Sequence, residues 1–145
     1  MYTATLTIDQ DILPATAVNL PSELNARQLL EVAFVQLQSD SELDPFLYEI
    51  EYYGYSQPVT DFTSYLGYEI ESIGGYVNGD SDNYWMLYVN GAAATVGIDS
   101  YLVQPNDEIA LQYINFGAVT DKAAASRLQQ INARRASRTA QRASQ

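Results

Sequence analysis

Residues 84–91 read Tyr84-Trp85-Met86-Leu87-Tyr88-Val89-Asn90-Gly91, and this run decides the fold prediction. Its side chains alternate between the two faces of a strand, with Trp85, Leu87 and Val89 on one face. Asn90 and Gly91 follow, and both tolerate the positive φ that a tight turn requires. We predict a strand that ends in a tight turn, and we expect Trp85 in the core because its face is apolar.

The same alternation recurs in five other segments, which are residues 2–8, 16–20, 46–52, 68–71 and 109–114. Between the second and the third segment the periodicity changes. Asn25 and Gln28 have the spacing of a capping box, and an apolar stripe follows at Leu29, Leu30, Ala33, Phe34 and Leu37. The order of two strands, one helix and then further strands implies an α+β domain in which one helix packs on a mixed sheet, which is the β-grasp or ubiquitin-like arrangement.

Charge divides the chain into two parts. Residues 1–120 hold 17 acidic side chains and one basic side chain, Arg27, which gives a formal charge of −16. Residues 121–145 hold six basic side chains and one acidic side chain, which gives +5, and the two parts sum to the net charge of −11. We predict a β-grasp domain over residues 1–120 and a basic C-terminal arm over residues 121–145, where composition shifts to Ala, Ser, Gln and Arg.

The arm is expected to be helical or extended, since good helix formers dominate it. Its apolar seam is thin and consists of Leu128, Ile131, Ala136, Ala140 and Ala143. This composition predicts an exposed helix or a frayed segment, so deletion of residues 121–145 is expected to leave the body folded.

Several classes of site are excluded by composition. The chain has no cysteine and no histidine, which removes disulfides, thiolate catalysis, common structural zinc sites and the usual general base. The carboxylate pairs Glu49 with Glu51 and Glu69 with Glu71 are interpreted as a solvated sheet face. Asp80, Asp82 and Asn83 form an oxygen-rich loop, but Trp85 stands where a calcium loop needs glycine. We therefore expect no enzyme, no cofactor and no metal site.

The N-terminus has no basic region, apolar stretch or A-x-A site, and no apolar run approaches the roughly 18 residues that span a bilayer. These features predict synthesis in the cytoplasm without a signal peptide, and no membrane partner. An acidic body repels a phosphate backbone, whereas the basic arm is suited to acidic protein, nucleic acid or lipid surfaces.

Four motifs carry a resemblance to a known family: Gly74-Gly75-Tyr76-Val77-Asn78-Gly79, residues 84–91, Gly97-Ile98-Asp99-Ser100-Tyr101 and Pro105-Asn106-Asp107-Glu108-Ile109. Together they resemble small β-grasp domains such as the C-terminal domain of transcobalamin and intrinsic factor and its bacterial surface-protein relatives. Asn106 stands where that family usually has glycine. In the vitamin carriers this domain closes over cobalamin together with a helical domain, so the resemblance implies the fold and a possible small-molecule site.

The 12 tyrosines are the strongest sign of an interface, because tyrosine supplies apolar area and a hydrogen-bonding tip together. We predict partner binding by Tyr52, Tyr53 and Tyr55, which we expect in a loop-bound cluster around Gly54, and anchoring of the arm on an acidic neighbour. The anchoring residues are Arg134, Arg135, Arg138 and Arg142.

Two functions follow from these features. The first is a non-enzymatic structural or interaction protein, a decoration or cement component of a large assembly such as a phage particle. Its partner would be a capsid or other scaffold protein, or further copies of this chain, and the product would be part of the virion. The alternative is a module that binds a cobalamin-like small molecule or a glycan through Tyr76, Tyr84 and Trp85.

Overall fold

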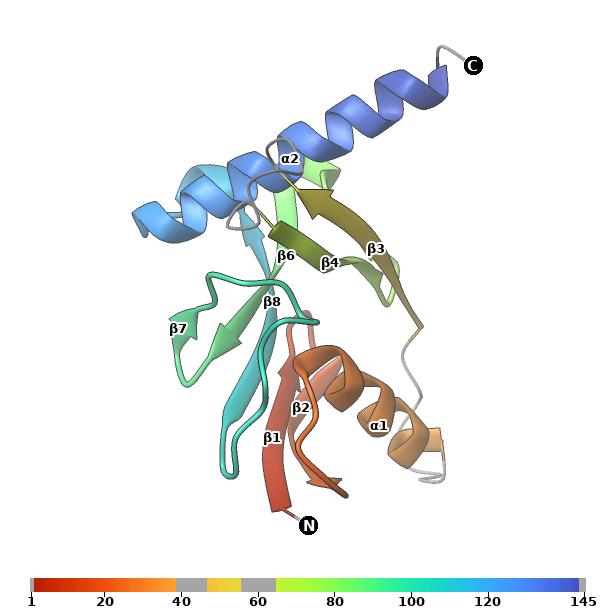
Figure 1. Ribbon diagram of the computed structural model, residues 1–145, viewed down its shortest axis with the longest axis vertical. Helices are drawn as coiled ribbons and strands as arrows, with labels where there is room; N and C mark the ends of the chain where they lie inside the picture. The colour runs from red at the N-terminus through yellow and green to blue at the C-terminus, as the bar shows by residue number, and fades with distance from the viewer. Residues whose placement is uncertain (1, 39–46, 56–64, 144–145) are drawn as a thin grey trace.

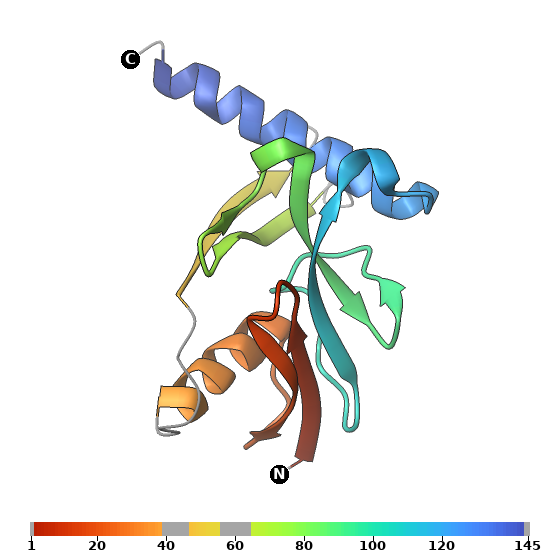
Figure 2. The same ribbon diagram turned by 180° about the vertical axis from the view of Figure 1, so that it is seen from behind.

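The computed structural model describes residues 2–38, 47–55 and 65–143, which form an α+β fold with two sheets and two helices (Figure 1). Helix α1 lies beside the first two strands at one end of the molecule, and helix α2 lies across the opposite end (Figure 1). Seen from behind, the C-terminal half of α2 again extends beyond the sheets (Figure 2). Within the described residues, no helix is long and apolar enough to span a membrane.

The larger sheet has five strands, which lie in the order β2 (Leu13–Leu20), β1 (Tyr2–Ile8), β8 (Glu108–Asn115), β6 (Asn83–Val89) and β7 (Ala92–Ala93). β1 is antiparallel to β2 and parallel to β8, and β6 is antiparallel to β8 and β7. A parallel pair needs a crossover connection, and here the segment between β1 and β8 contains α1 and the second sheet.

The smaller sheet has three antiparallel strands in the order β3 (Tyr48–Tyr55), β4 (Tyr65–Ile73) and β5 (Tyr76–Val77). Gly54 lies opposite Gly67, and the register shifts on both sides of Gly54. Both glycines have positive φ, 64° and 71°, which a residue with a β-carbon adopts only at a cost. The two strands are therefore kinked at the same level.

Helix α1 (Ala26–Gln38) begins where the capping box predicts. The backbone N–H of Gln28 donates to Oδ1 of Asn25 at 2.8 Å, and the N–H of Asn25 donates to Oε1 of Gln28 at 3.0 Å. The next two N–H groups, of Ala26 and Arg27, donate to the carbonyls of Tyr101 and Ile98. These bonds fix the start of α1 against the loop that precedes β8.

The main core lies between the larger sheet, α1 and one face of β4. The predicted stripe of α1 supplies Leu29, Leu30, Ala33 and Leu37, all at most 2% exposed. Trp85 is 2% exposed in the same cluster, so its predicted place in the core is confirmed. The tilted ring of Tyr113, 5.0 Å away, packs on it from β8.

Asn78 joins the two sheets. It is 3% exposed, its side-chain Nδ2 donates to the carbonyl of Ile70 in β4, and its Oδ1 accepts from the N–H of Trp85 in β6. The indole Nε1 of Trp85 donates to the carbonyl of Tyr76 in β5 at 2.8 Å. The Asn78-Gly79 pair, which the sequence identifies only as a turn, therefore holds the sheets together through buried polar contacts.

Two short 3-10 helices, η2 (Asp80–Asp82) and η3 (Phe116–Ala118), precede β6 and helix α2 (Lys122–Ala143). In α2 the side chains of Ala124, Leu128 and Ile131 are at most 2% exposed. They pack against Tyr84 and Met86 on one side and against Tyr53 and Leu66 on the other. The first half of α2 is thus part of the packed body rather than an exposed or frayed arm. The domain division at residue 120 stays a prediction.

Each predicted segment overlaps an observed strand, and the bounds differ by up to three residues. β5 and β7 have two residues each, too short for alternation to reveal them. β3 extends to Tyr55, so Tyr52, Tyr53 and Tyr55 lie in a strand and not in a loop, while Phe46 lies outside the described residues. The alternation of β3 therefore places Tyr52 and Tyr53 on opposite faces of the smaller sheet.

Candidate functional site

Four tyrosine rings form a continuous row on one face of β3 and β4. They follow one another in the order Tyr68, Tyr52, Tyr65 and Tyr55, with ring centroids 5.0, 6.2 and 5.0 Å apart. Tyr52 is 47% exposed, and the other three rings are partly buried. We call these four residues the tyrosine row. Adjacent rings are tilted by 51° to 58°, so their faces form an uneven, partly open aromatic surface.

The kink in the two strands explains how the row forms. Tyr52 pairs with Tyr68 across the strands, and Tyr55 pairs with Tyr65. In a regular strand, residues three apart lie on opposite faces. The left-handed glycine between the members of each strand, Gly54 or Gly67, shifts the register and brings both members to the same face.

Asp99 anchors the row from the loop before β8. Its Oδ2 accepts from the hydroxyl of Tyr65 at 2.9 Å, and its Oδ1 accepts from the backbone N–H of Tyr68 at 2.9 Å. A β-carbon on Gly67 would lie 2.4 Å from Oδ1, so only glycine leaves room for this carboxylate. Burial, followed by the bond to Asp99, raises the pKa of Tyr65.

Arg27 borders the row at the end formed by Tyr68. Its Cζ lies 5.0 Å from the centroid of the Tyr68 ring, within the range of a cation–π contact. Nη2 lies 3.8 Å from Oε1 of Glu31, and both side chains are exposed to solvent, 39% and 51%. The buried Nε has no hydrogen-bond partner. Arg27 is thus held mainly by the ring and an exposed carboxylate, which together stabilise it weakly.

The opposite face of the smaller sheet is closed by α2. There Arg127, 7% exposed, forms an ion pair with Glu69, and its guanidinium also donates to the carbonyls of Leu66 and Thr95. Burial raises the pKa of Glu69 to about 7, although Arg127 opposes that shift. The interpretation of Glu69 and Glu71 as a solvated face is wrong, because both lie under α2 and face arginines.

Tyr53 belongs to this closed face. It is fully buried, and its hydroxyl donates to Oε2 of Glu71 at 2.5 Å. Arg135 donates to the same carboxylate from Nε and Nη2, at 3.0 and 2.7 Å to Oε1. Nη1 of Arg135 would clash at 2.6 Å with a β-carbon on Gly79. Burial, with the bond to Glu71, raises the pKa of Tyr53.

Two of the four arginines predicted to anchor the arm have contacts that the structure describes. Nε of Arg134 donates to the carbonyl of Tyr53 at 3.2 Å, and Arg135 binds Glu71, so both contact their own chain. Arg138 and Arg142 lie on α2, and their side chains are outside the described residues. The acidic group that Arg135 binds is thus supplied by its own chain.

The residues of the alternative ligand site do not converge. Tyr84 and Trp85 are 3% and 2% exposed on opposite faces of β6, with Tyr84 bonded to Asn132 of α2. Tyr76 is 39% exposed and packs edge to face on Tyr113. Among the described residues, no three His, Cys, Asp or Glu side chains gather as a metal-binding group. Trp85 and Tyr76 lie together around Tyr113, whereas Tyr84 faces α2, so the three rings do not form one binding surface.

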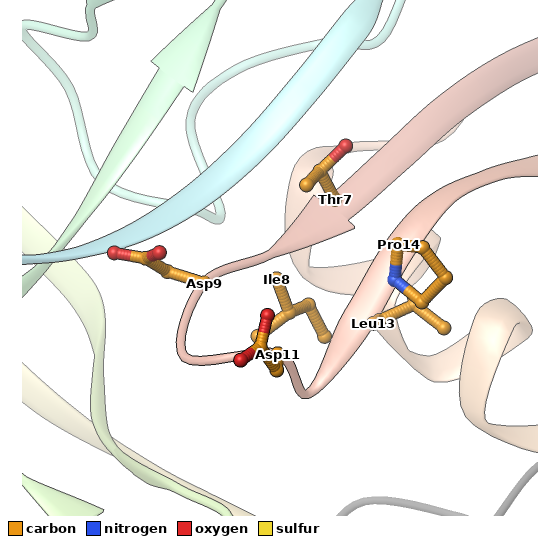
Figure 3. Close-up of a pocket in the computed structure, with 6 residues that line it drawn as sticks. All are labelled: Thr7, Ile8, Asp9, Asp11, Leu13 and Pro14. Carbon is orange, nitrogen blue, oxygen red and sulfur yellow. The ribbon is translucent and has the colours of Figure 1, made fainter.

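The pockets elsewhere bring few polar or charged side chains together. One of about 410 Å³ lies at the turn between β1 and β2 and is lined by Thr7, Ile8, Asp9, Asp11, Leu13 and Pro14 (Figure 3). In that view the Asp9 side chain points away from Leu13 and Pro14, and its Oδ2 accepts from the N–H of Tyr113. The tyrosine row therefore remains the best candidate site.

Sequence reasoning missed Arg27, Asp99, Tyr65 and Tyr68 as members of the site. One signal was present, because Gly54 and Gly67 each stand within a tyrosine-rich strand segment. Pairing of the two glycines depends on strand register, which the sequence does not display locally.

Comparison with known proteins supports the fold. No curated protein matches the sequence. The crystal structure of haptocorrin in complex with Cbi superimposes with a TM-score of 0.56 at 18% identity, covering 79% of this chain and 25% of haptocorrin. A protein from Ruminococcus gnavus ATCC 29149, described as a candidate metal binding protein, gives a TM-score of 0.51 at 12% identity over 78% of this chain and 94% of its own.

This chain therefore spans a quarter of the length of haptocorrin, and the likeness concerns the fold alone. It agrees at that level with the transcobalamin-like resemblance of the sequence motifs. The segment that carries β3 to β8 and the four motifs matches a defined family. Residues 44–115 match the family described as "Domain of unknown function (DUF4430)".

Proposed function

We propose that this chain is a non-enzymatic binding module whose recognition surface is the tyrosine row. The single observation that carries the proposal is the continuous set of four rings on one sheet face, with Tyr52 47% exposed at its centre. Tyrosine is enriched in interfaces because a rigid ring supplies contact area and a polar tip at low entropic cost. A protein partner fits this surface best, since the rings are spread along two strands.

The proposal retains a protein as the partner, but it changes the set of residues expected to bind that partner. Tyr52 and Tyr55 remain candidate partner-binding residues, joined by Tyr65 and Tyr68. Tyr53 and Arg135 are assigned to folding instead, because they are hydrogen-bonded to Glu71 under α2. Nothing in the fold or in the similar proteins supports a role in a phage particle, so the partner is proposed only as a protein.

Site-specific photo-cross-linking tests this proposal. With p-benzoylphenylalanine at Tyr52, we expect a covalent adduct with one protein in extracts of the native source, and we expect its yield to fall in the Tyr68→Leu background. The matched control carries the same cross-linker at Val35, which is 64% exposed on α1. Equal adduct yields from positions 52 and 35 would contradict the proposal.

A second candidate function is small-molecule binding, which the likeness to haptocorrin favours. The protein in that crystal structure is in complex with Cbi, and this chain corresponds to a quarter of it. Gel filtration after incubation with cobalamin tests this candidate, because a bound corrin elutes with the protein and is detected by its visible absorbance. Separate elution of all the corrin would exclude it.

We also propose the β-grasp architecture for the larger sheet and α1. Its support is the strand order β2-β1-β8-β6-β7 with β1 parallel to β8 near the centre, and a helix between the first hairpin and the rest. The smaller sheet would then be an insertion between α1 and β6 that carries the tyrosine row.

A further inference from the structure

The chain that carries the tyrosine row is strongly negative, with a formal net charge of −11. Residues 1–120 carry 17 acidic side chains against the single basic Arg27, and α2 adds six basic side chains. At an ionic strength near 0.1 M the field of such a body extends about 10 Å from the surface, which is the Debye length. A cation approaching the row is therefore attracted before contact, and an anion is repelled.

The geometry of the rings suits a cation as well. The guanidinium of Arg27 already lies 5.0 Å from the centroid of Tyr68, which shows that a ring face of the row accepts a positive charge. Tyr52 lies next in the row, tilted by 51° to Tyr68 and to Tyr65. The carboxylate of Asp99 accepts from the Tyr65 hydroxyl and so makes that ring a better partner for a cation.

We infer that the tyrosine row binds an arginine-bearing segment of a partner protein, with guanidinium groups on the ring faces beside Arg27. This inference rests on the proposed function and names the chemistry of its partner. Arginine fits better than lysine because its planar, weakly hydrated guanidinium stacks on aromatic rings. Arg27 is then a resident cation that competes for Tyr68 and limits affinity.

Three capped peptides of equal length serve as probes: Ac-Arg-Ala-Arg-Ala-NH2, its Gln analogue and its Glu analogue. Each is titrated into the whole chain with ring-labelled tyrosine, and the NMR shifts of Tyr52, Tyr65 and Tyr68 are followed. We expect the Arg peptide to bind about three- to fivefold more tightly than the Gln peptide, as exposed cation–π contacts predict. The Glu peptide is expected to bind more weakly than either.

The variant Arg27→Gln gives the sharpest test, because the two signs of ligand charge predict opposite results. Removal of the Arg27 charge should increase the affinity for the Arg peptide about twofold. The effect is small because the lost repulsion acts between solvent-exposed charges. Lys122→Gln is the control: it changes net charge equally, but Lys122 is the first residue of α2. The N-terminal end of that helix lies away from β3 (Figure 1). We expect no change in affinity for that variant.

Tyr52→Leu separates ring chemistry from apolar contact, because it keeps an apolar side chain and removes the aromatic face. The Arg peptide should lose about threefold in affinity, and the Gln peptide should be unaffected. The NMR shifts of the row are also measured without peptide at several protein concentrations. If they change with concentration in the parent but not in Arg138→Gln/Arg142→Gln, a second copy supplies the arginines, which supports the inference.

Three results would overturn the inference. They are equal affinity for the Arg and Gln peptides, tighter binding of the Glu peptide, and no shift in the row with any peptide at 10-fold molar excess. None of these results decides the proposed function, which the cross-linking experiment tests separately. A cross-linked partner whose contact segment is uncharged or acidic would support the tyrosine row as a binding surface and contradict its preference for arginine.

Discussion

The two faces of the smaller sheet are built from the same strands and have opposite surroundings. Tyr52 is 47% exposed on one face, and its neighbour Tyr53 is fully buried on the other. The buried face is closed by α2 through Arg127 and Arg135, whose guanidinium groups neutralise Glu69 and Glu71. The other face, which we call the open face, packs in part on the main core through Ile70 and carries the tyrosine row, where Tyr68 contacts Arg27 of α1. Alternation in one strand thus divides adjacent tyrosines between folding and recognition.

The comparison also separates two kinds of charge. On the closed face, oppositely charged groups are buried together, and removal of one partner leaves the other without compensation. On the open face, Arg27 and Glu31 are solvent-exposed at 3.8 Å and stabilise the fold little. Substitutions on the closed face should therefore change stability, and those on the open face should change binding.

The largest expected effect comes from removal of α2. Deletion of residues 122–145 removes the buried side chains of Leu128 and Ile131 and uncovers Tyr53 and Met86, where each large apolar side chain taken out of the core costs about 1.5–3 kcal/mol. We expect loss of the cooperative thermal transition followed by circular dichroism, opposite to the expectation from composition. An unchanged melting temperature would show that α2 is dispensable.

Leu128→Ala should have the next largest effect. Leu128 is fully buried in a cluster with Tyr84 and Met86, and leucine-to-alanine changes in cores cost about 2–5 kcal/mol. Chemical denaturation measures the change in the free energy of unfolding. The matched control Val35→Ala, at an exposed position of α1, should stay within about 0.5 kcal/mol of the parent.

Glu69→Gln should alter the pH dependence of stability. Burial raises the pKa of Glu69 from 4.5 to about 7, so between these pH values the folded protein binds a proton more readily than the unfolded chain. The free energy of unfolding therefore falls as pH rises through this window, by roughly 3 kcal/mol from this group. Denaturation at pH 4.5 and pH 8 should show a smaller fall in the Gln variant.

The control for this pH prediction is Glu31→Gln, whose side chain is 51% exposed. It should retain the full dependence of the parent. An identical slope in the parent and Glu69→Gln would indicate that Arg127 keeps Glu69 ionised throughout the window.

Removal of one hydroxyl gives the smallest effect. Tyr53→Phe deletes the buried donor to Glu71 and should cost about 1–3 kcal/mol, because the hydrogen bond involves a charged acceptor. Tyr52→Phe removes a hydroxyl on the open face and should change the free energy of unfolding by less than about 0.5 kcal/mol. Equal losses in the two variants would erase the difference between the faces.

The features that the sequence predicted correctly are local ones. The capping box at Asn25 and Gln28 and the face that buries Trp85 both depend on residues a few positions apart. These patterns were enough to establish an α+β fold with a helix in the right place.

The features that the sequence did not predict depend on distant pairs. Glu69 looks like half of a solvated carboxylate pair until Arg127, 58 residues away, is brought over it. The tyrosine row needs the register of Gly54 with Gly67, and its anchor Asp99 lies 31 residues from Tyr68. Strand pairing and the docking of α2 create both faces, and neither is encoded in a short window of sequence.

One paired measurement tests the division of labour between the faces most directly: the melting temperature and the retention of the cross-linked partner on immobilised protein, for Tyr52→Leu and Tyr53→Leu. The account predicts that Tyr52→Leu keeps the parent melting temperature and loses partner retention. It predicts that Tyr53→Leu melts several degrees lower and, below its transition, retains the partner as the parent does. Full retention by Tyr52→Leu, together with loss of retention by folded Tyr53→Leu, would contradict the account.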